Sequence, residues 1–514
     1  MNEPKQFSTE TAPDEIASEL ISEFRATGQY PRERVQDLIE LAISEDRETS
    51  ELASRAFFVS LVERLADSFE PAAVSLYNRA FAQLIQACCS SRQGREIARE
   101  LKAFNLSSEA DLIARAESLR RRQPPVWTSE SRSKVRRVVA LSRVTLGADV
   151  AITSVIIERV KREFPNASIT LVGGRKAAEL FGGDARLSFR EINYVRAATA
   201  IERLLSWLDV LAAVRETIGD LKRSEHLIVD PDSRLTQLGL LPASRSKDFT
   251  DSSSAFNEQS IYTNESLDGY LFFPSREYKS DTNHSLAELT SMWLNEIFGA
   301  TEQIYPCISL ARADINTASE LVARIGRGSE RPVIAINFGV GGNLAKRVGD
   351  RFEHALVARL IAAGAMVILD KGAGSDESRR ADAIINNTTQ IRLDGQQVRV
   401  IETDETHITN LLNSDRLDAD MLVWNGRIGL LAALISASDL YIGYDSAGQH
   451  IAAAAGVPCI DLFAGFSSTR MLDRWRPTGR AETRVIRVDA PADENEILST
   501  ALHHAREMLK NSGQ

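Results

Sequence analysis

The chain of 514 residues has few cysteines and no long apolar run. Its four cysteines make neither a CxxC pair, nor a zinc spacing, nor a disulfide framework. No stretch approaches 18 consecutive apolar residues, so the sequence predicts no membrane-spanning helix. The first residues lack the basic start and apolar run of a signal peptide. These absences predict a reduced, cytoplasmic protein and limit any contact with a membrane to a peripheral one.

An excess of positive charge is also missing. The formal net charge is −10 and the isoelectric point is near 5.5, which argues against a broad nucleic-acid-binding surface. Hydrophobic residues make up 43% and charged residues 26% of the chain, as in soluble globular proteins. The length exceeds one ordinary core, so we expect two or three domains.

The first quarter of the chain is patterned as helices. Residues 1–30 are polar and acidic and predict a disordered or weakly ordered tail. Over residues 31–118 apolar side chains recur at three- and four-residue steps, as in Val35, Leu38 and Leu41, which predicts a helical N-terminal domain. This domain either packs on itself or on the main body, or it binds a partner, which the sequence leaves unknown.

Residues 119–134 differ from both of their neighbours. Arginines cluster there, and Pro124-Pro125 would break any helix. We predict a basic linker with a solvated surface. Contact with anionic lipid or with a phosphorylated acceptor is the alternative.

From residue 135 short apolar strands alternate with amphipathic helices, which is typical of an α/β fold with parallel sheets. The predicted strands cover residues 138–142, 168–172, 226–230, 270–273, 333–337, 365–369, 439–443 and 458–463. The stretch is too long for one doubly wound sheet, and the poorly patterned residues 302–331 divide it. We predict two Rossmann-like domains, 135–325 and 326–485, facing a cleft, and a C-terminal helix over 486–514. The polar stretch 244–265 predicts a long loop that reaches an acceptor.

The most informative segment is residues 439–458, DLYIGYDSAGQHIAAAAGVP. An apolar strand runs into a polar turn and then into an alanine-rich helix. This order forms an anion site, because free backbone N–H groups and the positive end of the helix dipole meet there. The Ser446 hydroxyl can donate to a phosphate oxygen, and Gly448 lets a ligand approach the backbone. A capped helix with glycines for packing is the alternative on local chemistry alone.

The run GYDSAGQHIAAAAGVP resembles the C-terminal signature of the ADP-heptose:lipopolysaccharide heptosyltransferases, glycosyltransferase family 9, which is close to D-[ST]-G-x-x-H-x-A-A-A-x-G-x-P. Upstream, GRIGL at 426–430 and ASD at 437–439 are similar to the family's G-x-x-x-L helix ending in A-x-D. The family grips the donor diphosphate with this segment. The resemblance therefore implies donor-binding roles for Ser446, Ala447, Gly448 and His450. Asp445 would repel phosphate, so we expect it to cap the helix or to accept from a ribose or sugar hydroxyl of the donor.

The resemblance also implies an architecture and a reaction. It implies the GT-B arrangement of two Rossmann-like domains, here preceded by an all-α domain, in a bacterial protein of lipopolysaccharide biosynthesis. It implies a nucleotide-sugar donor, a saccharide or lipid-linked saccharide acceptor, and no metal or other cofactor. The resemblance implies a cytoplasmic location. Peripheral contact with the inner face of the inner membrane is compatible with it.

A second segment, VIAINFGVGGNLAKRVGDRF at 333–352, resembles the family's N-P-G-A-G…K-R-W-P-x-E-x-F. The resemblance implies that Asn337, Gly339 and Gly341 bind the donor. It implies that Lys346 neutralises the leaving diphosphate, a catalytic role that cations and helix dipoles fill when no metal is present. Val-Gly at 348–349 replaces the family's Trp-Pro.

A third segment, VVALSRVTLGADVAITSVIIERVKREFP at 138–165, resembles the family's I-R-L-S-S-L-G-D-V-L-H-T-x-P-A-L…F-P. The aspartate of that pattern is proposed as the general base, which implies a catalytic role for Asp149. An extra residue, Ala148, intervenes between the glycine and this aspartate. Capping of the helix by Asp149 is the alternative role and can coexist with catalysis. DPDSR at 230–234 resembles a strand end of the family and implies that Asp230 and Arg234 bind the acceptor.

Metal sites are weakly indicated. Of the seven histidines, only His450 lies in a segment with an independent reason to be a site, and His503 and His504 lie on a polar terminal helix. No HxxxH motif or His/Asp cluster predicts a metal centre. The DxD matches at 230–232 and 418–420 are weak candidates for a metal-chelated diphosphate.

We expect an inverting glycosyltransferase in which Asp149 deprotonates an acceptor hydroxyl that attacks the anomeric carbon of the donor sugar. A nucleotide-sugar 2-epimerase is one alternative, because it shares the two-domain plan. The other is a non-catalytic scaffold with a GT-B fold, because Ala148 is inserted and the Trp-Pro pair is absent.

Overall fold

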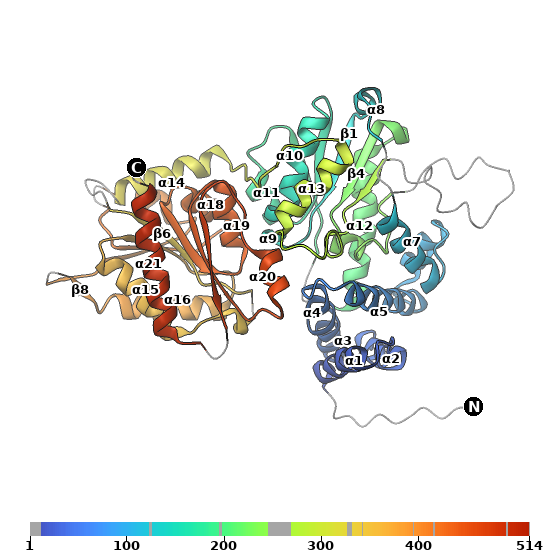
Figure 1. Cartoon of the computed structure of the whole chain (residues 1–514), viewed down its shortest axis with the longest axis horizontal. Helices are drawn as coiled ribbons and strands as arrows, with labels where there is room; N and C mark the ends of the chain where they lie inside the picture. Colours follow the sequence, from blue (N-terminus) through green and yellow to red (C-terminus); the bar gives the residue numbers. More distant parts are fainter. Residues whose placement is uncertain are drawn as a thin grey trace. The chain divides into compact units, whose positions relative to one another are not determined.

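The computed structural model describes residues 12–122, 126–194, 198–244, 269–325, 331–341, 343–393, 395–414, 417–489 and 492–512. The chain divides into two compact units (Figure 1). The N-terminal unit comprises residues 1–144, 170–174 and 190–282, and the C-terminal unit comprises 145–169, 175–189 and 283–514. Each unit holds a core of its own, and each is described by itself below.

The N-terminal unit begins with helices. They are α1 (Pro13–Thr27), α2 (Arg32–Ala42), α3 (Arg47–Arg55), η1 (Ala56–Glu63), α4 (Arg64–Ala66), α5 (Pro71–Ser90), α6 (Arg95–Lys102) and α7 (Glu109–Arg121). The expected tail over 1–30 is wrong for α1, because Ala17, Leu20 and Ile21 form a helical stripe that is buried. A short helix, α8 (Ser129–Lys134), lies in the predicted linker, whose Pro124 and Pro125 lie outside the described residues.

The N-terminal helices share a core with the rest of their unit. Phe57, Phe58 and Phe81 are fully buried and pack edge to face or tilted against one another. The same core takes in Trp207 of α12 (Ala200–Ile218) and Leu240, which follows that helix in the chain. The helices therefore pack on the main body of their unit rather than on themselves alone.

The first sheet has five strands in the order β3-β2-β1-β4-β5. They are β1 (Arg137–Leu141), β2 (Ser168–Gly173), β3 (Leu187–Glu191), β4 (His226–Asp230) and β5 (Tyr270–Phe272). The pairs β1/β4 and β4/β5 are parallel. Strand β3 was not predicted, because its mostly solvated residues carry no apolar run. The predicted acceptor loop at 244–265 lies outside the described residues except for Ser244.

The second sheet, in the C-terminal unit, has seven strands in the order β10-β11-β7-β6-β12-β13-β14, and every neighbouring pair is parallel. They are β6 (Val333–Asn337), β7 (Met366–Asp370), β10 (Val400–Thr403), β11 (Met421–Trp424), β12 (Leu440–Tyr444), β13 (Cys459–Ala464) and β14 (Thr483–Val488). A two-stranded antiparallel hairpin, β8 (Arg392–Leu393) and β9 (Gln396–Gln397), lies apart. The chain runs from β6 to β7 on one side and later crosses to β12 on the other. This reversal is the switch point at which open α/β sheets bind ligands.

Helices cover both faces of the second sheet (Figure 1). On one face α15 (Asp350–Ala362), α16 (Ser375–Thr388) and α21 (Glu494–Ser512) form the main core with the strands. The other helices of this unit are α9 (Leu146–Ala148), η2 (Asp149–Thr153), α10 (Ser154–Glu163), α11 (Arg175–Phe181), α13 (Leu286–Phe298), α14 (Arg312–Ile325), η8 (Leu344–Lys346), α17 (Ile408–Leu412), α18 (Ile428–Ser436), α19 (Ala447–Ala455) and α20 (Thr469–Trp475). Helix α19 packs on β12 and β13.

The predicted α/β class, with parallel sheets and a helical N-terminal region, is confirmed. Two details are corrected. The poorly patterned region 302–331 contains α14, whose Ala318 and Leu321 are fully buried. The C-terminal helix begins at Glu494 rather than at 486, because residues up to Val488 belong to β14 and pair with β13.

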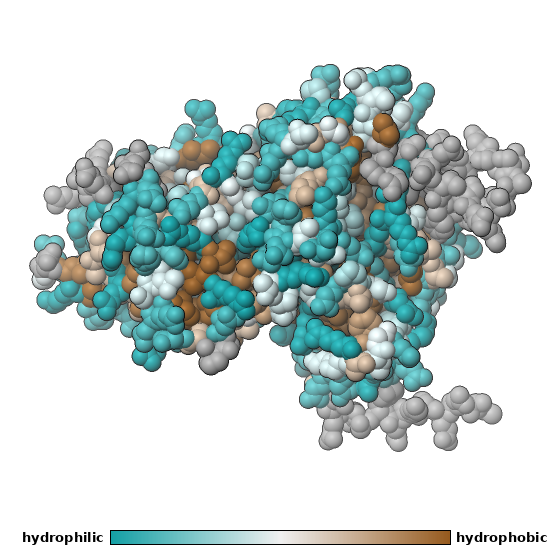
Figure 2. All heavy atoms as spheres, in the orientation of Figure 1, coloured by the Kyte–Doolittle hydropathy of each residue, from teal (hydrophilic) through white to brown (hydrophobic). Residues whose placement is uncertain are grey.

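The surface is mostly hydrophilic on the face drawn in Figure 2, with hydrophobic residues gathered between polar ones. Among the described residues, no helix is both long and apolar enough to cross a bilayer.

Candidate functional site

The switch point of the second sheet brings two of the predicted segments together. Strands β6 and β12 are neighbours, and the loop after β6 carries Lys346 while the turn after β12 carries Asp445. The Lys346 Nζ lies 2.5 Å from Asp445 Oδ2 and 3.4 Å from the Asp445 carbonyl oxygen. The lysine and the DSAGQH turn at 445–450, which are far apart in sequence, therefore form one site.

The carboxylate of Asp445 is fully engaged in this site. One oxygen pairs with Lys346, and the other accepts a hydrogen bond of 2.9 Å from Gln449 Nε2 in the first turn of α19. The side chain is only 7% exposed. The acid therefore holds the lysine against the helix end and is neutralised by it, which explains how an aspartate can lie beside an anion site. The expectation that Asp445 binds a sugar hydroxyl remains a prediction.

The N-terminus of α19 leaves donors available. Ser446 is the N-cap residue with an extended backbone, and its side chain does not cap the helix. The first backbone N–H groups of any helix, here those of Ala447, Gly448 and Gln449, have no intrahelical acceptor. Together with the helix dipole they favour a negatively charged ligand. The Ser446 hydroxyl is buried and has no hydrogen-bond partner among the described residues.

Gly448 is required by the packing beneath the turn. A Cβ at this position would lie 2.1 Å from the hydroxyl oxygen of Tyr441 on β12, and one on Gly443 would lie 2.3 Å from the same oxygen. No side chain fits in either place. The glycine in the motif therefore also lets the helix end pack closely against the strand, in addition to any approach of a ligand.

His450 is buried in the first turns of α19. Burial lowers the pKa of His450 to about 4; the nearby Asp445 opposes this shift and Lys346 adds to it. The imidazole is therefore neutral at pH 7. Its ring meets Trp475 edge to face, with centroids 6.1 Å apart.

The segment with Asp149 lies against α19. A Cβ on Gly147 would lie 3.0 Å from His450 Cδ2 and 3.6 Å from Ala447 Cα. Asp149 begins η2, a π-helical turn, is 2% exposed and accepts a 2.8 Å hydrogen bond from Thr153 Oγ1. A π-helical turn accommodates one extra residue in a helix. This turn can therefore accommodate the extra residue, Ala148, and the helix that follows need not shift.

The glycine-rich turn after β6 differs from the α19 turn. Its Gly339 N–H donates to Asn337 Oδ1 at 2.8 Å, and its Gly341 N–H donates to Glu377 Oε1 at 3.2 Å. The same carboxylate accepts from the N–H groups of Val340 at 3.0 Å and Ala373 at 3.0 Å. The donors expected to bind phosphate are thus already bonded within the protein. A role of Asn337, Gly339 and Gly341 in donor binding remains a prediction and would require these bonds to be exchanged.

Asn337 also contacts the end of β7. Its Nδ2 donates to a carboxylate oxygen of Asp370. Burial raises the pKa of Asp370 to about 6, the Gly372 N–H and Asn337 act in the opposite direction, and the charge of Glu377 adds to the rise. This cluster connects the ends of β6 and β7.

The two predicted acceptor residues are placed in the N-terminal unit. Asp230 is fully buried and accepts from Ser233 N at 2.8 Å, Thr236 Oγ1 at 2.6 Å and the Tyr270 hydroxyl at 2.7 Å. These bonds close the turn after β4. Arg234 lies 3.7 Å from Glu63 of η1. Both side chains thus have structural partners, and acceptor binding by them remains a prediction.

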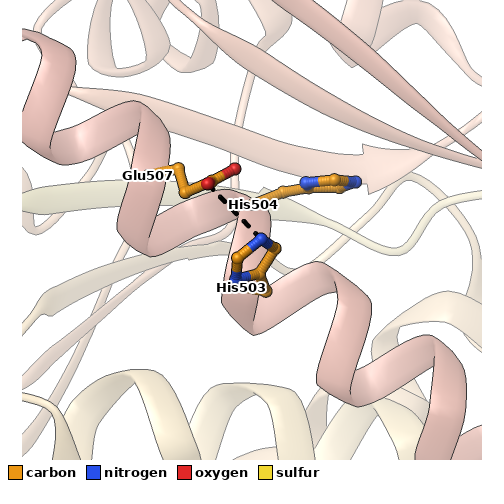
Figure 3. Close-up of side chains that lie close together, drawn as sticks. All are labelled: His503, His504 and Glu507. Carbon is orange, nitrogen blue, oxygen red and sulfur yellow. Dashed lines mark ion pairs between the residues drawn. The ribbon is translucent and has the colours of Figure 1, made fainter.

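One possible metal-binding group occurs among the described residues, on α21: His503, His504 and Glu507, whose ligand atoms lie within 4.8 Å of one another. In Figure 3 His503 pairs with Glu507 while His504 points to the side. Arg484 donates to Glu507 Oε2 at 2.6 Å and lies 2.8 Å from His504 Nδ1. A cation of the protein thus already occupies this group, which is better explained as an ion-pair network.

Sequence reasoning missed Asp461 on β13. It is fully buried, and neither carboxylate oxygen has a hydrogen-bond partner among the described residues. Burial raises the pKa of Asp461 well above its usual range, repulsion from Asp445 adds to the rise, and Lys346 opposes it. The signal was present in the sequence as a single acid within the apolar run CIDLFA.

Comparisons with known proteins bear on this site. Residues 405–501 match the sequence profile of glycosyltransferase family 9 (heptosyltransferase). No curated protein matches the chain significantly. Among solved structures, a family 9 glycosyl transferase from Veillonella parvula DSM 2008 shares 14% identity with a TM-score of 0.49, covering 74% of this chain and 98% of that one.

Two further structures are similar in the same range. E. coli ADP-heptose lps heptosyltransferase II shares 14% identity with a TM-score of 0.45, over 74% of this chain and 100% of its own. A UDP-N-acetylglucosamine 2-epimerase shares 11% identity with a TM-score of 0.35, over 74% and 90%. Identities and TM-scores this low do not indicate a function. A functional inference therefore depends on the sequence match and on the geometry of the site. Because residues 405–501 contain the whole α19 turn, the resemblance of this chain to glycosyltransferase family 9 (heptosyltransferase) is confirmed over that segment.

Proposed function

We propose that this chain is a glycosyltransferase that binds the diphosphate of a nucleotide-sugar at the N-terminus of α19. The observation that carries the proposal is the ion pair of 2.5 Å between Lys346 and Asp445, at the switch point and next to a helix end with available N–H groups. The helix end lies in the segment that matches family 9. Heptose is the sugar that the family description favours, and an ADP-linked donor is the one that the sequence resemblance implies.

The proposed reaction depends on stabilising the negative charge of the leaving diphosphate. As the bond between the anomeric carbon and the diphosphate breaks, negative charge grows on the leaving oxygens. The N–H groups of Ala447 to Gln449, the Ser446 hydroxyl and the Lys346 ammonium stabilise it, and such preorganised groups stabilise transition states strongly. Lys346 stays paired with Asp445 before the donor binds, so its position is preset. No metal is needed for this step.

We further propose inversion through Asp149 acting as general base. An acceptor hydroxyl, of a saccharide or a lipid-linked saccharide, loses its proton to Asp149 and attacks the anomeric carbon. The contact of Gly147 with His450 supports this role, because it brings the Asp149 segment to the α19 turn. Asp149 is buried and bonded to Thr153, so substrate binding must open access to its carboxylate.

A binding experiment tests the donor site. ADP, UDP, GDP and CDP, and ADP-heptose, are added to the full chain, and the unfolding midpoint is measured against ligand concentration. A ligand that binds the folded state raises the midpoint in a concentration-dependent way. No response to any of these ligands would contradict the proposal.

Asp149→Asn distinguishes the enzyme from the alternatives. A transferase keeps donor binding and loses transfer to acceptor; a scaffold keeps both its binding and its cellular role. Conversion of a donor sugar to its epimer in the absence of acceptor would favour the epimerase.

A further inference from the structure

A line of buried polar side chains runs from the second sheet to the N-terminus of α19. The register pairs Tyr441 with Cys459 and Gly443 with Asp461. Side chains alternate along a strand, so these four positions share one face. The residues between them, such as Ile442 and Ile460, belong to the core on the opposite face. Asp461 therefore lies on the face covered by α19.

The hydroxyl of Tyr441 bridges the space between strand and helix. It lies over Gly443, the residue paired with Asp461, and also against Gly448 in the first turn of α19. Burial raises the pKa of Tyr441 well above its usual range, the neighbouring Ser446 hydroxyl opposes this rise, and the nearby Asp461 adds to it. Asp461, Tyr441 and Ser446 thus follow one another from the sheet to the helix end.

These groups are buried without partners. Within the described part of the chain, neither Asp461 oxygen, nor the Tyr441 hydroxyl, nor the Ser446 hydroxyl has a hydrogen bond of normal geometry. Buried polar groups are nearly always paired, and each exception requires an explanation. To pair with one another, these groups must bring their oxygens closer together, because none of the oxygens now meets a partner in hydrogen-bond geometry.

The surrounding charges decide the protonation of Asp461. Burial disfavours the charged carboxylate of Asp461 most strongly, and repulsion from Asp445 of the α19 turn adds to this effect. Attraction by Lys346 of η8 acts in the opposite direction and is weaker. His450 of α19 is neutral, because burial lowers its pKa. Burial also keeps the Cys459 thiol protonated, and Asp370 of β7 acts on Tyr441. Burial without a partner and repulsion from Asp445 therefore both favour the protonated carboxyl of Asp461.

We propose that Asp461, Tyr441 and Ser446 close, when the donor binds, into a directed chain of hydrogen bonds that points the hydroxyl hydrogen of Ser446 at a phosphate oxygen of the donor. Asp461 donates to Tyr441, Tyr441 donates to Ser446, and Ser446 donates to phosphate. An ionised Asp461 would accept from Tyr441 and reverse the chain, so that Ser446 would present a lone pair to the phosphate. Tyr441 and Asp461 are positioning residues, and the inference rests on the proposed donor site.

A double-mutant cycle tests the chain. The probe is whichever of ADP, UDP, GDP and CDP binds the unsubstituted full chain most tightly by titration calorimetry. Tyr441→Phe should weaken binding about tenfold, the size of one lost charge-assisted hydrogen bond. In a Ser446→Ala background it should have no further effect. Its unfolding midpoint without ligand should not fall, because it removes a buried hydroxyl that lacks a partner.

Tyr444→Phe is the matched control. Tyr444 lies on the same strand but on the opposite face, where its hydroxyl bonds to Glu353 and to the Val348 N–H. Its effect on binding should be the same with and without Ser446→Ala. An equal effect of Tyr441→Phe in both backgrounds would overturn the chain.

Two substitutions of Asp461 test its direction. Asp461→Asn keeps a donor group in place and should bind the probe within about threefold of the unsubstituted chain. Asp461→Leu removes the donor and should weaken binding as much as Tyr441→Phe; if this variant does not fold, the cycle decides alone. Weakening by Asp461→Asn as large as by Tyr441→Phe would overturn the chain. Absence of any nucleotide binding by the unsubstituted protein would overturn the proposed function together with the chain, whereas binding without coupling overturns the chain alone.

Discussion

Two glycine-rich turns of the second sheet look alike in sequence and differ in structure. The turn after β12 leaves the first N–H groups of α19 available, and its aspartate is paired with Lys346. The turn after β6 has its N–H groups bonded to Asn337 and Glu377. The comparison teaches that glycines show only that a backbone can bend or approach closely. Whether an anion can bind depends on which acceptors the fold has already placed there.

The largest expected effect comes from the cation at the α19 turn. Lys346→Met should lower kcat/KM for sugar transfer by about 100-fold or more, because a preorganised charge that stabilises the leaving group is lost. The assay is release of nucleoside diphosphate in the presence of acceptor. Lys371→Met is the control: Lys371 follows β7 and pairs with Asp382 and Glu402, so transfer should change little. Equal losses in the two variants would contradict the assignment.

The two regions should respond oppositely to pH. His450 has a folded pKa of about 4, below its unfolded value, so its contribution disfavours folding progressively as pH falls from about 6.5 to 4. Asp370 has a folded pKa of about 6, above its unfolded value, so its contribution favours folding at low pH and is lost as pH rises from about 4 to 6. Each of these two contributions to the free energy of unfolding amounts to about 3 kcal/mol.

Urea unfolding at pH 4, 5, 6 and 7 measures both contributions. His450→Gln should make the free energy of unfolding fall less steeply toward acid pH, and Asp370→Asn should do the reverse. Changes of the same sign in the two variants would show that one of the two environments is misassigned.

Close packing under the α19 turn makes its glycine irreplaceable. Gly448→Ala should cost about 1–3 kcal/mol of stability and weaken donor binding, because its Cβ would meet the Tyr441 hydroxyl at 2.1 Å. Gly374→Ala, near the other turn, is the control, since its Cβ would meet nothing within 4 Å. Thermal unfolding compares the two, and an unchanged midpoint for Gly448→Ala would contradict this packing.

The smallest effects separate binding from stability. Ser446→Ala should weaken nucleoside diphosphate binding about tenfold and leave the unfolding free energy unchanged. Glu377→Gln should lower the unfolding free energy by about 1 kcal/mol and leave nucleotide affinity unchanged, because it weakens three internal hydrogen bonds. Calorimetry and urea unfolding of both variants measure the difference. Loss of nucleotide affinity in Glu377→Gln would show that the glycine-rich turn after β6 also contributes to the donor site.

Much of the fold could be read from the pattern of apolar residues. Strands such as β4 and β6 were predicted with their observed bounds, because three or four apolar residues in a row are followed by a polar one. Strands β3, β10, β11 and β14 were not predicted. The edge strands β3, β10 and β14 have few fully buried residues, and the short apolar run of β11 cannot be told from a helix by periodicity. Helix α1 was missed because its buried stripe is short and surrounded by acids.

The site was predicted in part for a similar reason. Residues 405–501 carry the family signature in local sequence, so the α19 turn could be recognised. The burial of Asp230 could not, because its partner Tyr270 lies 40 residues away. The same holds for Glu377, which reaches a turn 36 residues earlier.

By itself, the sequence determined the α/β class, the alanine-rich helix after β12 and the presence of a lysine after β6, because each depends on neighbouring residues. Only the tertiary structure decided that Lys346 meets Asp445, that Glu377 occupies the N–H groups of the other glycine-rich turn, and that Asp461 is buried beneath α19. These are contacts across the ends of parallel strands. Parallel strands are joined by long crossovers, so residues that meet at a sheet edge are distant in sequence and leave no local pattern.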